Sequence, residues 1–160
     1  MSVARIAKGL IAAIALTTAA CACSDTTSTI DAVQAQSEEQ TRLLQGKENV
    51  FVGYEKEVLD LLARPHLGDA LTSQTIQAAE FVEIVYTGVG YLLTVRHPSL
   101  PTDRMVLDSP LVHGAEAGLE HGLGFVVFIE DHEMTLECFA LADVLPSDIR
   151  ERQVVITTSK

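Results

Sequence analysis

Apolar and polar side chains alternate most regularly between residues 123 and 140. An apolar side chain occupies every second position on each side of a polar break at residues 130–133. The alternating set is Leu123, Phe125, Val127 and Ile129, then Met134, Leu136, Cys138 and Ala140. A period of two is typical of a strand with one buried face. The pattern therefore predicts a β-hairpin, entered from a glycine-rich loop at residues 118–122.

The register of this hairpin follows if Asp131 and His132 form a two-residue turn. The predicted opposite pairs are Ile129 with Met134, Val127 with Leu136, and Phe125 with Cys138. A slip by one residue would bury Thr135 and Glu137 instead, so the register should be well specified. Such a turn needs positive φ at both central residues, which His adopts less readily than Asp, so a longer loop stays an alternative. The second face of the hairpin is mixed in polarity, and we expect another element to cover part of it.

Upstream of the hairpin the apolar period is helical. Residues 50–63 place five apolar side chains on one stripe, with four charged residues largely opposite, and Pro65 should end the helix. The stripe is Phe51, Tyr54, Val58, Leu61 and Leu62, and the charged set is Glu55, Lys56, Glu57 and Asp60. A second helix is predicted over residues 67–77. Residues 24–36 are polar and predict a flexible tether, followed by a short helix from Ser37 through Leu44.

Further strands are predicted over residues 81–86, 91–96, 104–107, 111–113 and 153–157. Helices that precede a run of strands are typical of the α+β class. We therefore predict N-terminal helices packed on one face of a five- to six-stranded, mainly antiparallel meander sheet. Residues 49–160 form a single domain of this kind, since about 110 residues supply one ordinary core. Residues 23–48 form the tether.

Residues 1–22 have the composition of an export signal. Arg5 and Lys8 precede an apolar run over residues 9–20 that is too short for a comfortable membrane span and is followed by small residues. A cut before Cys23 fits an ordinary signal peptide. Alternatively, Cys21 or Cys23 resembles the lipidated cysteine of bacterial lipoproteins, although neither has the preferred leucine three residues earlier. We favour an exported lipoprotein that faces the periplasm, with a soluble periplasmic protein as the alternative.

The charge of the chain narrows the class of partner. Formal net charge is −11, and loss of Arg5 and Lys8 with the signal would move it to −13. Such a surface repels nucleic acid and anionic headgroups and favours basic partners or cations. An acidic surface also serves solubility alone. Cys138, on the predicted core face, is expected to be a small buried thiol.

Glu120 and His121 are the first candidate ligand-binding residues. They lie between glycines, with His113, Asp131 and His132 nearby in the sequence. Carboxylates and imidazoles in loops bind Zn²⁺ or act as acid and base, but no spacing here matches a metal motif. The simpler alternative is that the pair hydrogen-bonds the backbone of a tight loop. We predict no metal and no cofactor.

Glu137 is the third candidate, because the predicted register places it mid-strand on the mixed face, opposite Val126. A carboxylate there is partly desolvated, which raises its pKa unless a cation or donor meets it. Arg96 and Arg104 are the candidate cations. Glu137 is thus either a binding or acid–base carboxylate, or a sheet-surface Glu paired with Arg.

Three segments together resemble a widespread uncharacterised family of small bacterial proteins. They run Tyr86-Thr87-Gly88-Val89-Gly90-Tyr91, then Gly118-Leu119-Glu120-His121-Gly122-Leu123-Gly124-Phe125-Val126-Val127-Phe128, then Leu136-Glu137-Cys138-Phe139. The pattern of that family resembles YTGVGF, GLEHGxGFxLF, a D-G turn and LEGF. This chain has His132 and Cys138 where the family has glycine, and it lacks the tryptophan expected near Leu145-Pro146. The resemblance implies a shared α+β fold and no catalytic residue.

The function that these patterns favour is a non-enzymatic domain of the cell envelope, held by a lipid anchor, that binds a protein or another envelope component. A basic protein partner would suit the charge. The alternative is a small enzyme or metal-binding module that uses Glu120, His121 and Glu137, and it requires these three residues to converge in one pocket. A purely structural envelope lipoprotein is the third hypothesis.

Overall fold

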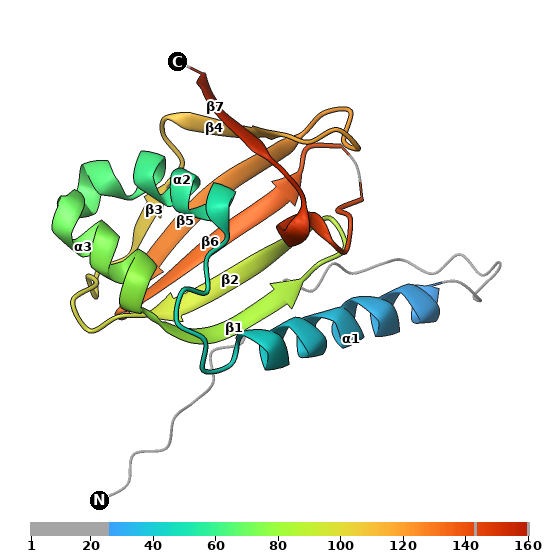
Figure 1. Cartoon of the computed structure of the whole chain (residues 1–160), viewed down its shortest axis with the longest axis horizontal. Coiled ribbons are helices and arrows are strands. Elements are labelled where there is room, and N and C mark those ends of the chain that lie inside the picture. Colours follow the sequence, from blue (N-terminus) through green and yellow to red (C-terminus); the bar gives the residue numbers. More distant parts are fainter. Residues whose placement is uncertain (1–25, 143, 160) are drawn as a thin grey trace, which may run out of the picture.

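The structure is a computed structural model, which describes residues 26–142 and 144–159 (Figure 1). The elements in order are α1 (Thr26–Leu44), α2 (Gly53–Leu62), α3 (Arg64–Ala78), β1 (Glu80–Tyr86), β2 (Gly90–Arg96), β3 (Met105–Leu107), β4 (Leu111–Ala115), β5 (Leu123–Glu130), β6 (Glu133–Ala140), the 3-10 helix η1 (Ile149–Glu151) and β7 (Val155–Ser159). Helices precede strands, so the α+β class is confirmed. The predicted export signal, with Cys21 and Cys23, lies outside the described residues.

The strands form one antiparallel sheet in the order β1-β2-β6-β5-β4-β7, and β3 pairs with the far half of β5. The described sheet thus has seven strands, and its order is not a simple meander. In a meander β3 would pair with β2. Here β6 takes that place and lies between β2 and β5. The reason is length, because β2 pairs with β6 over seven residues, whereas β3 has only three to offer.

The hairpin of β5 and β6 has the predicted register. Ile129 lies opposite Met134, and Phe125 lies opposite Cys138. The turn has two residues, because Asp131 and His132 both adopt positive φ, at 52° and 66°. This is the combination that a type I′ turn requires, and it matches the twist of the strands.

The two faces of the sheet are covered differently. On the core face, α2 packs against the strands, α3 packs beside α2, and the apolar side chains of β2, β5 and β6 are buried (Figure 1). The other face, called the open face here, carries the alternate side chains of the same strands. Its central members are Val85, Leu92, Thr94, Val126, Phe128, Thr135, Glu137 and Phe139. Of the described helices only α1 reaches this face, at its β1 edge, where α1 and Val85 line a common groove.

α1 corrects the predicted tether. Residues 26–36 are helical, and they continue without a break into the predicted short helix that ends at Leu44. The helix lies along β1, the edge strand of the sheet (Figure 1). The Ser37 hydroxyl accepts a hydrogen bond from the Tyr86 amide at 2.9 Å, and the Gln36 side chain donates to the Ser147 carbonyl at 2.9 Å. These contacts with the folded domain stabilise a helix whose polar composition does not favour it.

The other two helices follow the predictions in part. α2 buries Leu59 in place of Leu61, and it also buries Glu55, which the sequence placed on the polar side. α3 begins at Arg64 rather than at 67, because Pro65 lies in its first turn, where a missing amide costs nothing. Gly68 kinks α3 with φ at 79°.

Candidate functional site

Glu120 and His121 lie in the loop between β4 and β5, and both are exposed. Within the described ranges neither makes a side-chain hydrogen bond, so the predicted bonding to the loop backbone is not found there. No group of three His, Cys, Asp or Glu side chains among the described residues is arranged to hold a metal ion. The loop therefore presents these two side chains to solvent.

The glycines around this pair have a packing role. Gly122 adopts φ of 74°, and a β-carbon on it would lie 2.5 Å from the Gly114 carbonyl oxygen. A β-carbon on Gly124 would lie 2.5 Å from the ring of Phe139, which crosses it from the next strand. Any larger residue at these positions would collide with a neighbour. The glycine-rich motif is thus explained by the close approach of β4, β5 and β6.

Glu137 lies in the middle of the open face, on β6. It is half-buried, and its neighbours in the same row are Leu92 on β2 and Val126 on β5. The row continues to Val85 on β1, which lies opposite Leu92. The row therefore spans four strands, and the carboxylate on β6 is accompanied by aliphatic side chains from the other three.

The predicted arginine partners do not reach Glu137. Arg96 instead pairs with Glu133 at the far end of the open face, and its Nε donates to Glu133 Oε1 at 3.1 Å. Arg104 lies exposed in the loop before β3. Over residues 26–142 and 144–159, no hydrogen bond or ion pair is found for the Glu137 side chain. The three candidate residues consequently form no common site, because Glu120 and His121 lie in a loop and Glu137 lies on a strand face.

A buried polar network lies on the core face, and the sequence did not predict it. Its centre is Glu55, which is 0% exposed. Glu55 Oε1 accepts from the Tyr91 hydroxyl at 2.6 Å and from Arg150 Nε at 2.8 Å. Its Oε2 accepts from the Val52 amide at 2.8 Å and from an Arg150 terminal nitrogen at 3.0 Å. Four donors thus meet the two oxygens, which is the condition for burying a carboxylate.

The network joins segments that are far apart in the sequence. Arg150 belongs to η1, and it also donates to the Val50 carbonyl at 2.6 Å. Tyr54 and Tyr91 share a hydrogen bond of 2.9 Å between their hydroxyls. The network therefore ties the start of α2, the strand β2 and the C-terminal segment together. Because every polar atom of Glu55 is engaged within the protein, we interpret the network as structural.

Burial controls the ionisation of the groups around Glu55. Desolvation raises the pKa of the Tyr91 and Tyr54 hydroxyls and of the Cys138 thiol well above their ordinary values. Burial likewise raises the pKa of Tyr86 to about 12, and the positive charge of Arg150 opposes that rise in part. The negative charge of Glu55 adds to the effect at each of the four groups. Cys138 is thus a neutral, buried thiol, as predicted, and is unsuited to act as a nucleophile.

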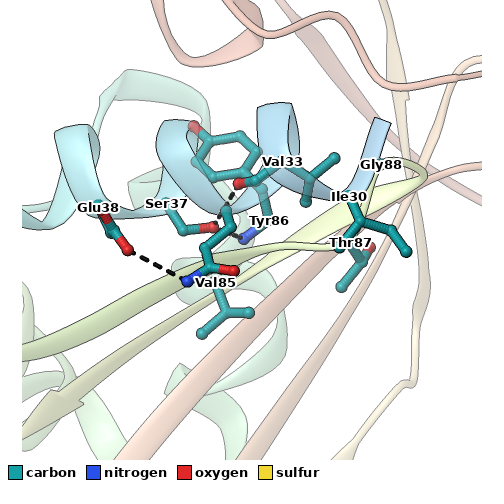
Figure 2. A pocket seen from close by; sticks show the side chains of 9 residues that line it. Ile30, Val33, Ser37, Glu38, Val85, Tyr86, Thr87 and Gly88 are labelled. Atoms are coloured by element: carbon teal, nitrogen blue, oxygen red, sulfur yellow. Dashed lines mark hydrogen bonds between the residues drawn. The ribbon is translucent and has the colours of Figure 1, made fainter. Parts of the chain in front are cut away.

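A groove of about 490 Å³ lies between α1 and the end of β1 (Figure 2). Its aliphatic lining comes from Ile30 and Val33 on α1 and from Val85 on β1, as Figure 2 shows. Polar groups stand at its rim, where the Gln34 amide donates to Glu38 at 3.3 Å. Val85 also belongs to the open face, so the groove and the row through Glu137 share one side chain.

Comparisons with family models, with curated proteins and with solved structures gave no match for this chain. The resemblance to the uncharacterised bacterial family therefore stays a prediction. Over the part of the chain that the structure describes, no helix is both long and apolar enough to cross a membrane.

Proposed function

We propose that this chain is an exported, lipid-anchored, non-enzymatic binding protein of the cell envelope, which holds a basic protein partner on its open face. The observation that carries the proposal is the position of Glu137, a half-buried carboxylate in a row of aliphatic side chains. An apolar surface with one central charge favours a partner segment that presents aliphatic groups around a single Lys or Arg.

Charge complementarity supports the choice of a basic partner. The open face also carries Glu83 beside Thr94, and the chain as a whole has a formal net charge of −11. A cation that reaches Glu137 would relieve the desolvation of that carboxylate while its own aliphatic stem covers Leu92 and Val126. The acidic surroundings would increase the rate at which such a partner associates.

The experiment is site-specific photo-cross-linking in the native cells. A photoreactive phenylalanine at Leu92, next to Glu137, should give an adduct with a basic protein, and Glu137→Arg in the same chain should abolish that adduct. The matched control places the probe at Glu57, which is exposed on α2 behind the other face. An adduct that persists with Glu137→Arg, or equal labelling from residue 57, would contradict the proposal.

A further inference from the structure

Five of the exposed large aliphatic side chains lie at one end of the molecule. They are Ile30 at the start of α1, Val85 at the end of β1, Val89 in the turn between β1 and β2, and Leu141 and Val144 after β6. The start of α1, this turn and the segment after β6 lie at the right-hand end of Figure 1. We call Ile30, Val89, Leu141 and Val144 the apolar tip.

Direct contacts hold the segments of the tip together. The Leu145 amide donates to the Gly88 carbonyl at 3.1 Å, and the Ala140 amide donates to the Val89 carbonyl at 2.8 Å. Ile30 lines the α1 groove together with Thr87 and Gly88. The tip is therefore one surface built from three segments, and not a set of scattered exposed residues.

The tip is poor in charge on a strongly acidic chain. Residues 84–95 contain no charged side chain, and residues 138–147 contain only Asp143, which lies outside the described residues. Asp31 follows Ile30 on α1. Exposed aliphatic groups can insert into a lipid bilayer with neutral headgroups. Binding to an anionic bilayer would favour basic residues beside them, and the tip has none.

The predicted lipid anchor lies close in sequence to the start of α1, which is at the same end of the molecule as the tip. Cys21 and Cys23 precede Thr26, the first described residue, by five and three positions. Even a fully extended chain spans at most about 18 Å over five residues. An anchor at either cysteine would hold the start of α1, and with it the tip, close to the bilayer surface.

We infer that the apolar tip inserts into the interface of a zwitterionic lipid bilayer and so orients the anchored domain. This inference rests on the anchored location in the proposed function and adds a second, non-covalent membrane contact. A lipid on the N-terminal segment alone holds the domain at the bilayer without fixing its orientation, and the tip supplies the contact that fixes it. With the tip in the headgroup layer, the open face stands beside the membrane and stays accessible to a partner.

The chain has no tryptophan, so one substitution supplies the only indole of the protein. Val144→Trp and, separately, Val89→Trp place the indole in the tip. Val106→Trp is the matched control, because Val106 is 48% exposed against 57% for Val89 and lies on β3, away from the tip. Each mature variant is purified from membranes, weighed intact, and reconstituted into phosphatidylcholine vesicles with and without brominated lipid.

We expect brominated lipid to quench the tryptophan at 144 and at 89 and to leave the one at 106 unaffected. Adding Val89→Ser to the Val144→Trp variant should weaken this quenching, since the tip then loses the transfer energy of one aliphatic side chain. Lipidated protein with equal quenching at all three positions would overturn the inference and leave the proposed function intact. Concentration-dependent dimerisation without quenching would overturn it in favour of a second copy at the tip.

The intact mass separates the two proposals. An unlipidated mass with quenching at 144 and 89 would remove the anchor and support the tip as a membrane contact by itself. An unlipidated mass without quenching would overturn both the anchor and the inference.

Discussion

Two glutamates on opposite sides of the same sheet have opposite environments. Glu55 is fully buried on the core face, and its oxygens accept four hydrogen bonds, two of them from Arg150. Glu137 is half-buried on the open face among aliphatic side chains, and within the described ranges it has no such partner. A carboxylate with all its donors supplied stabilises a fold, whereas one that lacks them costs desolvation energy. The comparison therefore assigns Glu55 to stability and makes Glu137 the candidate for binding.

The largest expected effect tests the buried network around Glu55, and it is a loss of folding stability at high pH. Burial raises the pKa of Tyr54, Tyr91 and Cys138 in the folded protein, from ordinary values of 10.0 for tyrosine and 9.0 for cysteine. The unfolded chain loses these protons first, so stability is complete below about pH 9 and falls as the pH rises toward the folded pKa values. Each group contributes a fall of about 1.4 kcal/mol per pH unit in that window.

Urea unfolding followed by far-UV circular dichroism between pH 7 and 11 measures this loss. We expect a constant free energy of unfolding up to about pH 9 and a steep decline above it, as several of these groups begin to ionise in the unfolded chain. A profile that stays flat to pH 11 would show that the network is open to solvent.

The next largest loss of stability is expected when Glu55 loses its partner Arg150. Arg150→Met removes both charge-assisted hydrogen bonds to a carboxylate that stays buried, and we expect a cost of about 3–5 kcal/mol in the free energy of unfolding. Arg152→Met is the control, because Arg152 is partly exposed and pairs with Asp148 and Glu116 near the surface. That control should cost no more than about 1 kcal/mol. Equal losses in urea unfolding would contradict the special role of the buried pair.

A smaller effect on stability distinguishes the two buried tyrosines on the strands, Tyr86 on β1 and Tyr91 on β2. The Tyr91 hydroxyl donates to Glu55, whereas the Tyr86 hydroxyl is buried without a hydrogen-bond partner within the described residues. Tyr91→Phe should cost about 1–3 kcal/mol, because it leaves a charged acceptor under-satisfied. Tyr86→Phe should change stability by less than about 0.5 kcal/mol, because it removes an atom with no partner. A reversed order of the two urea midpoints would show that the hydroxyl of Tyr86 is the one that matters.

The contrast between the two glutamates also marks the limit of prediction from the sequence. The register of β5 and β6 could be predicted because it depends on the local alternation and on a two-residue turn. The buried state of Glu55 could not, because its partner Arg150 lies 95 positions away and joins it only through the tertiary fold. The helical period placed Glu55 opposite the apolar stripe, on the polar side, and that prediction was wrong.

The first part of α1 could not be predicted from the sequence for the same reason, because its stabilising contacts are tertiary. Residues 26–36 are polar enough to predict a tether, yet they form part of α1. The stabilising contacts, from Ser37 to Tyr86 and from Gln36 to Ser147, are all long-range. The local composition of residues 26–36 does not indicate these contacts. The strand order was missed for the same reason, since it depends on which strand offers β2 the longest partner.

The smallest effect on stability tests the open face directly. Glu137→Leu replaces a half-buried carboxylate that has aliphatic neighbours, so we expect a change within about 1 kcal/mol, toward higher stability. Glu55→Leu is the matched substitution on the core face, and it should destabilise by about 3 kcal/mol or more, because it leaves Arg150 buried and unpaired. Urea unfolding of the two variants at pH 7 provides the measurement. If Glu137→Leu costs more than about 2 kcal/mol, Glu137 supports the fold through contacts of its own, and its place as a binding residue would be lost. If it costs nothing, the carboxylate is present at a position where stability alone would favour an aliphatic residue, which is the result we expect of a binding residue.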